Sequence, residues 1–359
     1  MPGWRDIEIN RRSSGYHHFI GLFIEREAPC VMTSEPKVSV GLPVYNGERY
    51  LAEAINSILG QTFESFELVI SDNASNDGTG SICRSYAARD GRVRYYRNEE
   101  NLGAGPNFNR TFELARGRYF RWAAHDDLLE PTYLERCVEA LDRDVGAVLC
   151  QAGVRQIDED GRTIAPVHFP LVGADDPSPS RRFARNVLAT HSCRDIFGLI
   201  RSEALRGMPL HEGCLDTDRI ILAELSLRGR FVHLPEPLFI HRDHPQRFVH
   251  AAHGDRHARI MWYNPRRAGD RSRHRAVLWR SYFASVRRSA PTLSTRLSCY
   301  GCLLCWPVVQ SAKFIRLKMY QKYNSLDPRS RTKIRRVKRL LFWWRVVSPP
   351  SAEQARPHG

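Results

Sequence analysis

The chain has 359 residues, of which 42% are hydrophobic and 10% aromatic. This composition supports a sizeable packed core, so it excludes a disordered protein. The length predicts one large α/β domain with an appendage, or two domains. The formal net charge of +15 leaves three classes of partner open: a nucleic acid, an anionic membrane surface or a phosphorylated substrate.

The positive charge is concentrated near the C-terminus. Residues 266–345 hold 21 Lys and Arg but two acids, which gives a net charge of +19 and leaves a net charge of −4 for the remainder. The sequence therefore predicts a mildly acidic main part followed by a basic region at residues 255–359.

Residues 1–36 show no regular pattern. The apolar stretch Phe19–Ile24 is too short for a signal peptide, and the charged residues Glu25–Glu27 follow it. No segment of the sequence reaches the roughly 18 to 20 apolar residues that span a bilayer. We therefore expect an N-terminal extension outside the fold, in a cytoplasmic protein that the basic region can hold at the inner face of the cell membrane.

From Lys37 onward the hydrophobic pattern alternates between strands and helices. The strand Val38–Val44 precedes a helix at Glu48–Leu59 with apolar residues at helical spacing. Such alternation predicts βαβ units and a mainly parallel sheet, in which ligands bind at the carboxyl ends of the strands. The other elements expected in this half are strands at Phe66–Ile70, Val93–Arg97 and Tyr119–Ala124, and helices at Ser81–Arg89 and within Asn98–Ala115.

The second half is less regular, and we place the end of the domain near Gly254, so that it covers residues 37–254. We expect strands at Gly146–Gln151, Ile196–Ile200 and Phe231–Leu234, a turn at Asp158–Gly161, a loop at Pro166–Ser180 and a helix at Asp218–Arg228.

Two acidic clusters follow predicted strands. Asp126 and Asp127 are adjacent carboxylates that repel each other unless a cation or hydrogen bonds compensate, which a hard divalent ion would do. The alternative is an ordinary helix cap. Asp72 ends an apolar strand, where a carboxylate can bind the hydroxyls of a ribose or the NH of a pyrimidine. The Asn, Ser and Gly residues after it also fit a plain turn-rich loop.

Four motifs stand in a recognisable order: Pro43–Gly47, Asp72–Thr79, Asn101–Gly103 and His125–Asp127. In order and rough spacing, the stretch Lys37–His244 that carries them resembles the family 2 glycosyltransferases with the GT-A fold. The resemblance implies a mainly parallel α/β fold that binds a nucleotide-sugar. It also implies transfer of the sugar with inversion at the anomeric carbon.

The resemblance also implies roles for individual residues. Asp127 would bind Mg²⁺ or Mn²⁺, although His125 stands where the family usually has the first Asp of an Asp-x-Asp motif. His244 and Arg242, after the last predicted strand, are close in sequence to where the family often has a basic residue near the metal or diphosphate; a polar surface loop is the alternative. The residues implied in donor binding are Pro43, Val44, Tyr45, Asp72 and Asp126.

Inversion by direct displacement requires a general base near the acceptor hydroxyl. In the family this base is an acid shortly before a helix in the second half, and the matching stretch here is Leu215–Ile221. We expect Asp218 to be the base, with Asp216 as the second choice, because an Asp at a helix start is also the ordinary cap.

The segment Arg329–Arg345 has apolar residues at helical spacing among many bases. This pattern favours a helix on an anionic membrane surface over a solvated helix packed on the domain, and we expect no nucleic-acid partner. The sequence thus predicts a metal-dependent transferase that adds one sugar to a saccharide or lipid-linked acceptor. The rival class is a non-catalytic nucleotide-sugar-binding or nucleic-acid-associated protein.

Overall fold

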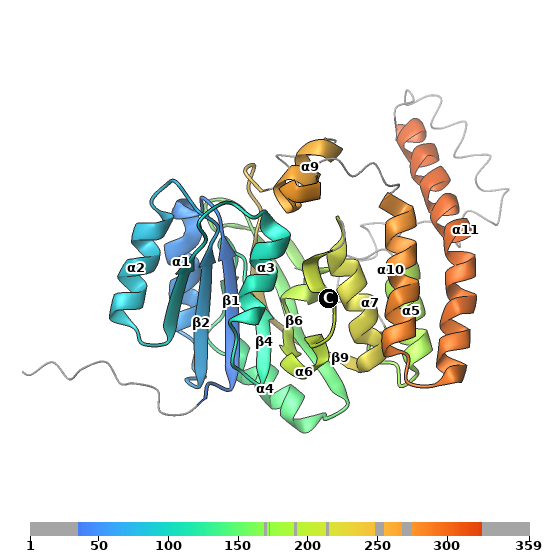
Figure 1. Ribbon diagram of the computed structural model, residues 1–359, viewed down its shortest axis with the longest axis horizontal. Coiled ribbons are helices and arrows are strands. Elements are labelled where there is room, and N and C mark those ends of the chain that lie inside the picture. Colours follow the sequence, from blue (N-terminus) through green and yellow to red (C-terminus); the bar gives the residue numbers. More distant parts are fainter. Residues whose placement is uncertain are drawn as a thin grey trace, which may run out of the picture.

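The computed structural model describes residues 35–168, 171, 173–189, 192–212, 215–247, 255–267 and 274–324 (Figure 1). Its centre is a nine-stranded mixed sheet with the order β3-β2-β1-β4-β8-β6-β9-β5, and β7 pairs with β6. The mixed α/β architecture with a mostly parallel sheet is the one that the sequence predicts.

The first half is a parallel unit. The strands are β1 (Val38–Val44), β2 (Phe66–Asp72), β3 (Val93–Arg97) and β4 (Tyr119–Trp122), and the helices are α1 (Glu48–Leu59), α2 (Thr79–Arg89) and α3 (Ala104–Glu113). Every residue of β1 and β2 is buried, as expected for central strands that are covered on both faces. All the predicted elements of this half are present.

The second half adds antiparallel neighbours. It comprises β5 (Leu128–Leu129), α4 (Tyr133–Arg143), β6 (Ala147–Ile157), β7 (Thr163–His168), α5 (Pro179–Leu188), η1 (Arg194–Phe197), β8 (Leu199–Arg201), α6 (Ser202–Leu205), η2 (Leu210–Glu212), α7 (Thr217–Arg228) and β9 (Arg230–Arg242). β8 runs antiparallel to both β4 and β6 and so joins the two halves of the sheet.

Several sequence-based expectations differ from the structure here. β6 continues six residues beyond Gln151, and β7 and α5 occupy the two ends of the predicted loop Pro166–Ser180. The predicted strand Ile196–Ile200 begins as a turn of 3-10 helix, and its strand part is short because β4 and β6 offer pairing partners only from Leu199 onward. β9 continues beyond Leu234 for eight more residues. A register shift in the pairing with β6 lets the strand pass Pro235 and Pro237, which cannot donate ladder hydrogen bonds.

The C-terminal helices pack on the domain. These elements are α9 (Arg256–Tyr263), η3 (Pro265–Arg267), α10 (His274–Ser289) and α11 (Leu293–Asn324). α10 and α11 lie beside α5 and α7 and share a hydrophobic core with them (Figure 1). At its edge, the buried Glu224 of α7 accepts hydrogen bonds from Arg288 and Ser289 of α10 at 2.8 and 2.7 Å.

Parts of the sequence predictions lie outside the described residues, namely residues 1–34 of the N-terminal extension and the segment Arg329–Arg345. Among the helices that the structure describes, none combines the length and the apolar composition needed to cross a bilayer.

Candidate active site at the carboxyl ends of the strands

Asp72 ends β2 with its side chain fully buried. Its Oδ1 atom accepts a hydrogen bond from the Ser75 backbone at 2.8 Å, and its Oδ2 atom accepts from Tyr95 and Arg97 at 2.8 and 2.7 Å. Although burial by itself raises the pKa of Asp72, these hydrogen bonds lower it below its usual value. The carboxylate thus faces protein donors, and Arg97, with 43% of its side chain exposed, extends this cluster towards solvent.

Of the three residues predicted at the end of β1, only Tyr45 has an exposed side chain. Pro43 and Val44 are buried, and Val44 uses its carbonyl to accept from the backbone of Asn73 at 2.8 Å. The following Gly47 lets the loops after β1 and β4 meet, since a Cβ there would lie 2.7 Å from the His125 ring. The tight approach brings Tyr45 and the acidic pair to the same edge of the sheet.

Asp126 and Asp127 follow β4 and are almost fully buried. The Nε2 atom of His244 lies 3.0 Å from Asp126 Oδ2, and the backbone N–H of Arg242 donates to Asp127 Oδ1 at 3.0 Å. Burial raises the pKa of Asp126. The hydrogen bond from His244 and the charges of His125 and Arg247 outweigh it, so that the pKa falls well below the ordinary value.

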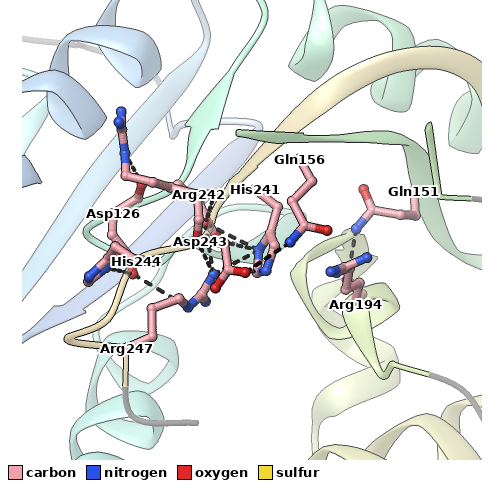
Figure 2. A network of polar contacts seen from close by, with 10 residues as sticks. Asp126, Gln151, Gln156, Arg194, His241, Arg242, Asp243, His244 and Arg247 are labelled. Atoms are coloured by element: carbon pink, nitrogen blue, oxygen red, sulfur yellow. Dashed lines mark hydrogen bonds and ion pairs between the residues drawn. The ribbon is translucent and has the colours of Figure 1, made fainter. Parts of the chain in front are cut away.

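Two arginines from the end of β9 and the loop after it complete this corner, and sequence reasoning gave a role to only one of them (Figure 2). The Arg247 guanidinium lies 3.7 Å from Asp126 Oδ2 and 3.6 Å from Asp127 Oδ1. The guanidinium of Arg242 donates to the backbone carbonyl of Asp126 at 3.2 Å and to Glu53 of α1 at 2.6 Å, and so holds β9 to the domain. Arg247 lies three residues after His244 in a cluster of charged residues, and this position was the sequence signal that could have identified it.

The acidic corner has ligand types suited to a divalent ion, but its donors are partly occupied. Within the described part of the chain, no group of three or more His, Cys, Asp or Glu side chains has a metal-binding arrangement. His244 approaches Asp126 rather than Asp127, and among the described residues its buried Nδ1 atom has no hydrogen-bond partner. Carboxylate oxygens and an imidazole fit Mg²⁺ or Mn²⁺ chemically. The guanidinium of Arg247 supplies part of the positive charge that such an ion would bring.

Asp216 and Asp218 form a second acidic corner at the start of α7. Asp216 is the residue before the helix and has a left-handed backbone (φ 64°), which turns the chain into α7. Asp218 lies in the first turn. Burial, followed by the charge of Asp216, raises the pKa of Asp218 to about 6, although 43% of its side chain remains accessible. A carboxyl that is both reachable and poised near neutral pH is suited to proton transfer.

The buried imidazole of His211 connects this corner to the sheet. Its Nδ1 atom lies 3.7 Å from Asp218 Oδ1 and 3.1 Å from the hydroxyl of Tyr263 in α9. Its ring packs edge-on against Trp122, the last residue of β4, with centroids 5.0 Å apart. Burial lowers the pKa of His211 to about 3, so the imidazole is neutral at physiological pH. Neither His211 nor Tyr263 belongs to a motif that sequence reasoning could have selected.

Comparison with known proteins identifies this scaffold. Residues 39–205 match the family model described as Glycosyl transferase family 2. The chain carries a family 2 glycosyltransferase domain. The matched residues include β1 to β4 and the acidic pair after β4, so the family assignment covers the edge of the sheet described above.

Curated relatives match part of this chain rather than the whole. EpsE of Bacillus subtilis, which is named as a glycosyltransferase, is 38% identical over 131 residues, or 36% of this chain and 47% of that protein. Chondroitin synthase of Escherichia coli is 33% identical over 141 residues, or 39% of this chain and 20% of that protein. The first curated relatives are Rickettsia glycosyltransferases, and the chain spans about a fifth to two fifths of their length.

A solved structure extends the likeness of the fold beyond the matched segment. The mannosyltransferase PcManGT from Pyrobaculum calidifontis, solved with GDP-Man and Mn²⁺, aligns with a TM-score of 0.50 at 17% identity. The alignment covers 88% of this chain and 83% of that chain. The family 2 domain therefore has the glycosyltransferase fold that the sequence predicts.

Proposed function

We propose that the protein is an inverting glycosyltransferase that moves one sugar, of the hexosyl type, from a nucleoside-diphosphate-sugar to an acceptor hydroxyl. The observation that carries the proposal is Asp218, an accessible carboxyl with a pKa of about 6 in a domain of family 2. A base with this pKa is largely ionised at neutral pH and still basic enough to accept a proton from a hydroxyl as it attacks.

In the proposed reaction, Asp218 accepts the proton of the acceptor hydroxyl while the acceptor oxygen attacks the anomeric carbon. The bond from that carbon to the donor diphosphate breaks, and the nucleoside diphosphate leaves from the opposite face. Asp216 is the second candidate base. Its Oδ1 atom lies 3.9 Å from Arg259, so this carboxylate already has a cationic partner.

The donor side of the proposal uses the edge formed by β1, β2 and β4. Tyr45 is exposed there and can pack on the base, Asp72 fixes the loop after β2, and Asp126 faces the donor sugar or ribose. Pro43 and Val44 contribute backbone, since their side chains are buried. The positive charge of Arg247 can stabilise the negative charge that develops on the leaving diphosphate.

Asp127 and His244 would hold a Mg²⁺ or Mn²⁺ ion in this proposal. When bound, such an ion neutralises diphosphate charge. Metal dependence is supported by the ligand types at the corner. Binding of the ion to Asp127 and His244 requires that His244 and Arg247 change partners, because both side chains now contact Asp126.

The acceptor is proposed to be a saccharide or a lipid-linked saccharide, in the synthesis of a cell-envelope polysaccharide or glycolipid. The support is the likeness to chondroitin synthase and EpsE, together with the basic C-terminal helices, which suit a peripheral position at the inner face of the membrane. The non-catalytic alternative is disfavoured, because Asp72, Asp126, Asp127 and Asp218 are all present in a family 2 domain.

The test is a screen of nucleoside-diphosphate-sugars for thermal stabilisation of the protein and for release of the nucleoside diphosphate with Mn²⁺. One donor is expected to stabilise the protein, and Asp127→Ala is expected to abolish the effect. Asp160→Ala, in the exposed turn between β6 and β7, is the matched control. If no donor stabilises the native protein or is hydrolysed by it, the proposal is wrong.

A further inference from the structure

The long helix α11 has one face that packs on the domain. Cys299, Leu303 and Trp306 are buried against α5 and α10, and the indole N–H of Trp306 donates to the carbonyl of Val187 at 3.2 Å. This face holds α11 on α5 and α10, and α10 in turn is bound to Glu224 of α7 through Arg288. The remaining faces of α11 point away from this contact.

A stripe of exposed apolar side chains runs along the side of α11 away from this core. Its members are between 51% and 71% exposed. They recur with a period of eleven residues, which equals three helical turns of 3.67 residues and therefore keeps them in line. They are 26 residues apart at the ends, about 39 Å of helix at 1.5 Å per residue. We call this set the α11 stripe: Leu293, Leu297, Leu304, Val308, Ile315 and Met319.

The charge around the α11 stripe has one sign. The sequence of α11 contains five bases and no acid, and α10 likewise contains no Asp or Glu. After α11 the chain continues for another 35 residues, which include the basic segment 329–345. A second copy of α11 would bring the same charge to the stripe, so like-charge repulsion opposes pairing of two copies.

We propose that the α11 stripe is a docking surface for an anionic lipid bilayer. Monomeric soluble proteins rarely expose contiguous apolar surface of this extent. A helix with an apolar stripe and surrounding bases lies in the plane of the interface, with the stripe at the boundary of headgroups and acyl chains. The bases then face the anionic headgroups. An anionic bilayer therefore accounts for both the apolar stripe and the positive charge of α11.

Docking through the α11 stripe has a consequence for the active site. α11 packs on α10, and α10 is bound to Glu224 of α7, the same helix that carries Asp218 in its first turn. The base is thus connected to the docking helix through the packed helices α7 and α10. This arrangement suits an acceptor that is itself anchored in the membrane. The inference rests on the membrane association proposed above but not on the transfer chemistry.

The test uses the full-length chain with the double variant Leu304→Asp/Val308→Asp. Sedimentation with vesicles of phosphatidylglycerol and phosphatidylcholine at low salt is expected to show binding of the native protein, and binding at least tenfold weaker for the double variant. Val145→Asp is the matched control, because Val145 is 86% exposed between α4 and β6, far from α11 in sequence. Unchanged thermal unfolding of both variants would show that the fold is intact.

Several outcomes would overturn the proposal. They are absence of vesicle binding by the native protein, equal binding by the double variant, or a native dimer in light scattering that the double variant converts to a monomer. Donor hydrolysis without vesicles is expected to be equal in all three proteins. A failure of the docking proposal therefore remains distinguishable from a failure of the glycosyltransferase proposal, in which no protein would hydrolyse any donor.

Discussion

The two acidic corners of the domain contain the same chemical groups but place them in opposite environments. Asp126 is surrounded by His244, His125 and Arg247, and its pKa is lowered well below the ordinary value. Asp218 is partly buried beside Asp216 and a neutral His211, and its pKa is raised to about 6. Desolvation acts on both carboxyls, so the difference comes from the charges around each one.

This difference in pKa suits the two corners to different steps of a displacement reaction. A carboxylate that stays ionised at every physiological pH can hold cations or hydroxyl groups but is a poor proton acceptor. A carboxyl that titrates near pH 6 can accept a proton at neutral pH. The donor side therefore needs the first kind and the acceptor side the second.

The largest expected effect comes from removing the base. Asp218→Asn keeps the shape of the side chain but cannot accept a proton, and it is expected to lower kcat by about 10²- to 10⁴-fold. Asp216→Asn is expected to lower it by less than tenfold. Both are measured as nucleoside diphosphate release with an acceptor. Near-normal turnover in Asp218→Asn together with loss in Asp216→Asn would exchange the two roles.

The second effect tests the acidic corner formed by Asp126 and Asp127, which the proposal assigns to donor binding and which we call the donor corner. Asp127→Asn is expected to weaken binding of the donor nucleotide with Mn²⁺ by about ten- to a hundredfold, since it removes a charged partner of a charge-assisted site. Calorimetric titration with and without Mn²⁺ is the measurement. Donor affinity that is unchanged by the substitution would mean that Asp127 stabilises the fold but does not take part in donor binding.

The third effect concerns pH. Because the pKa of Asp218 is raised to about 6, the base is protonated below this pH and ionised above it. The value of kcat/KM is expected to rise about tenfold per unit up to pH 6 and to level off above it. Asp126, with its lowered pKa, contributes no inflection in this range. A pH profile that is flat between pH 5 and 7 would contradict the assignment of the base.

The smallest effect tests the counter-charge at the donor corner. Arg247→Gln removes the guanidinium that lies within 4 Å of both Asp126 and Asp127. The free protein is expected to bind Mn²⁺ a few-fold more tightly, since the ion no longer competes with a fixed positive charge. Thermal stabilisation by Mn²⁺ without donor measures this. Arg162→Gln in the exposed turn after β6 serves as its control, and equal stabilisation of the two variants would refute the competition.

The first half of the fold could be predicted almost completely from the sequence. β1, α1 and β3 have the predicted bounds because the hydrophobic period and the turn residues agree there. The second half was less predictable. Pro235 and Pro237 interrupt the strand pattern of β9, and only the pairing with β6 carries the strand past them.

The same division holds for the site. The candidate carboxylates could be selected because each follows a predicted strand or precedes a predicted helix. Their partners could not be, since Arg247 and Tyr263 lie far from the carboxylates in the sequence and contact the site only through the fold. The hydrogen bonds from Tyr95 and Arg97 to Asp72 could not be predicted from the sequence either, because they depend on the register of β2 and β3.

The sequence by itself determined the order of the elements in the first half, the positions of the four carboxylates and the concentration of positive charge near the C-terminus. These are local properties, which follow from residue type and spacing along the chain. Only the tertiary structure decided that one carboxyl is held ionised and another is raised to about pH 6, and that the apolar residues of α11 face outward in a line. Electrostatic environment and exposure depend on neighbours that the fold brings together from distant parts of the chain.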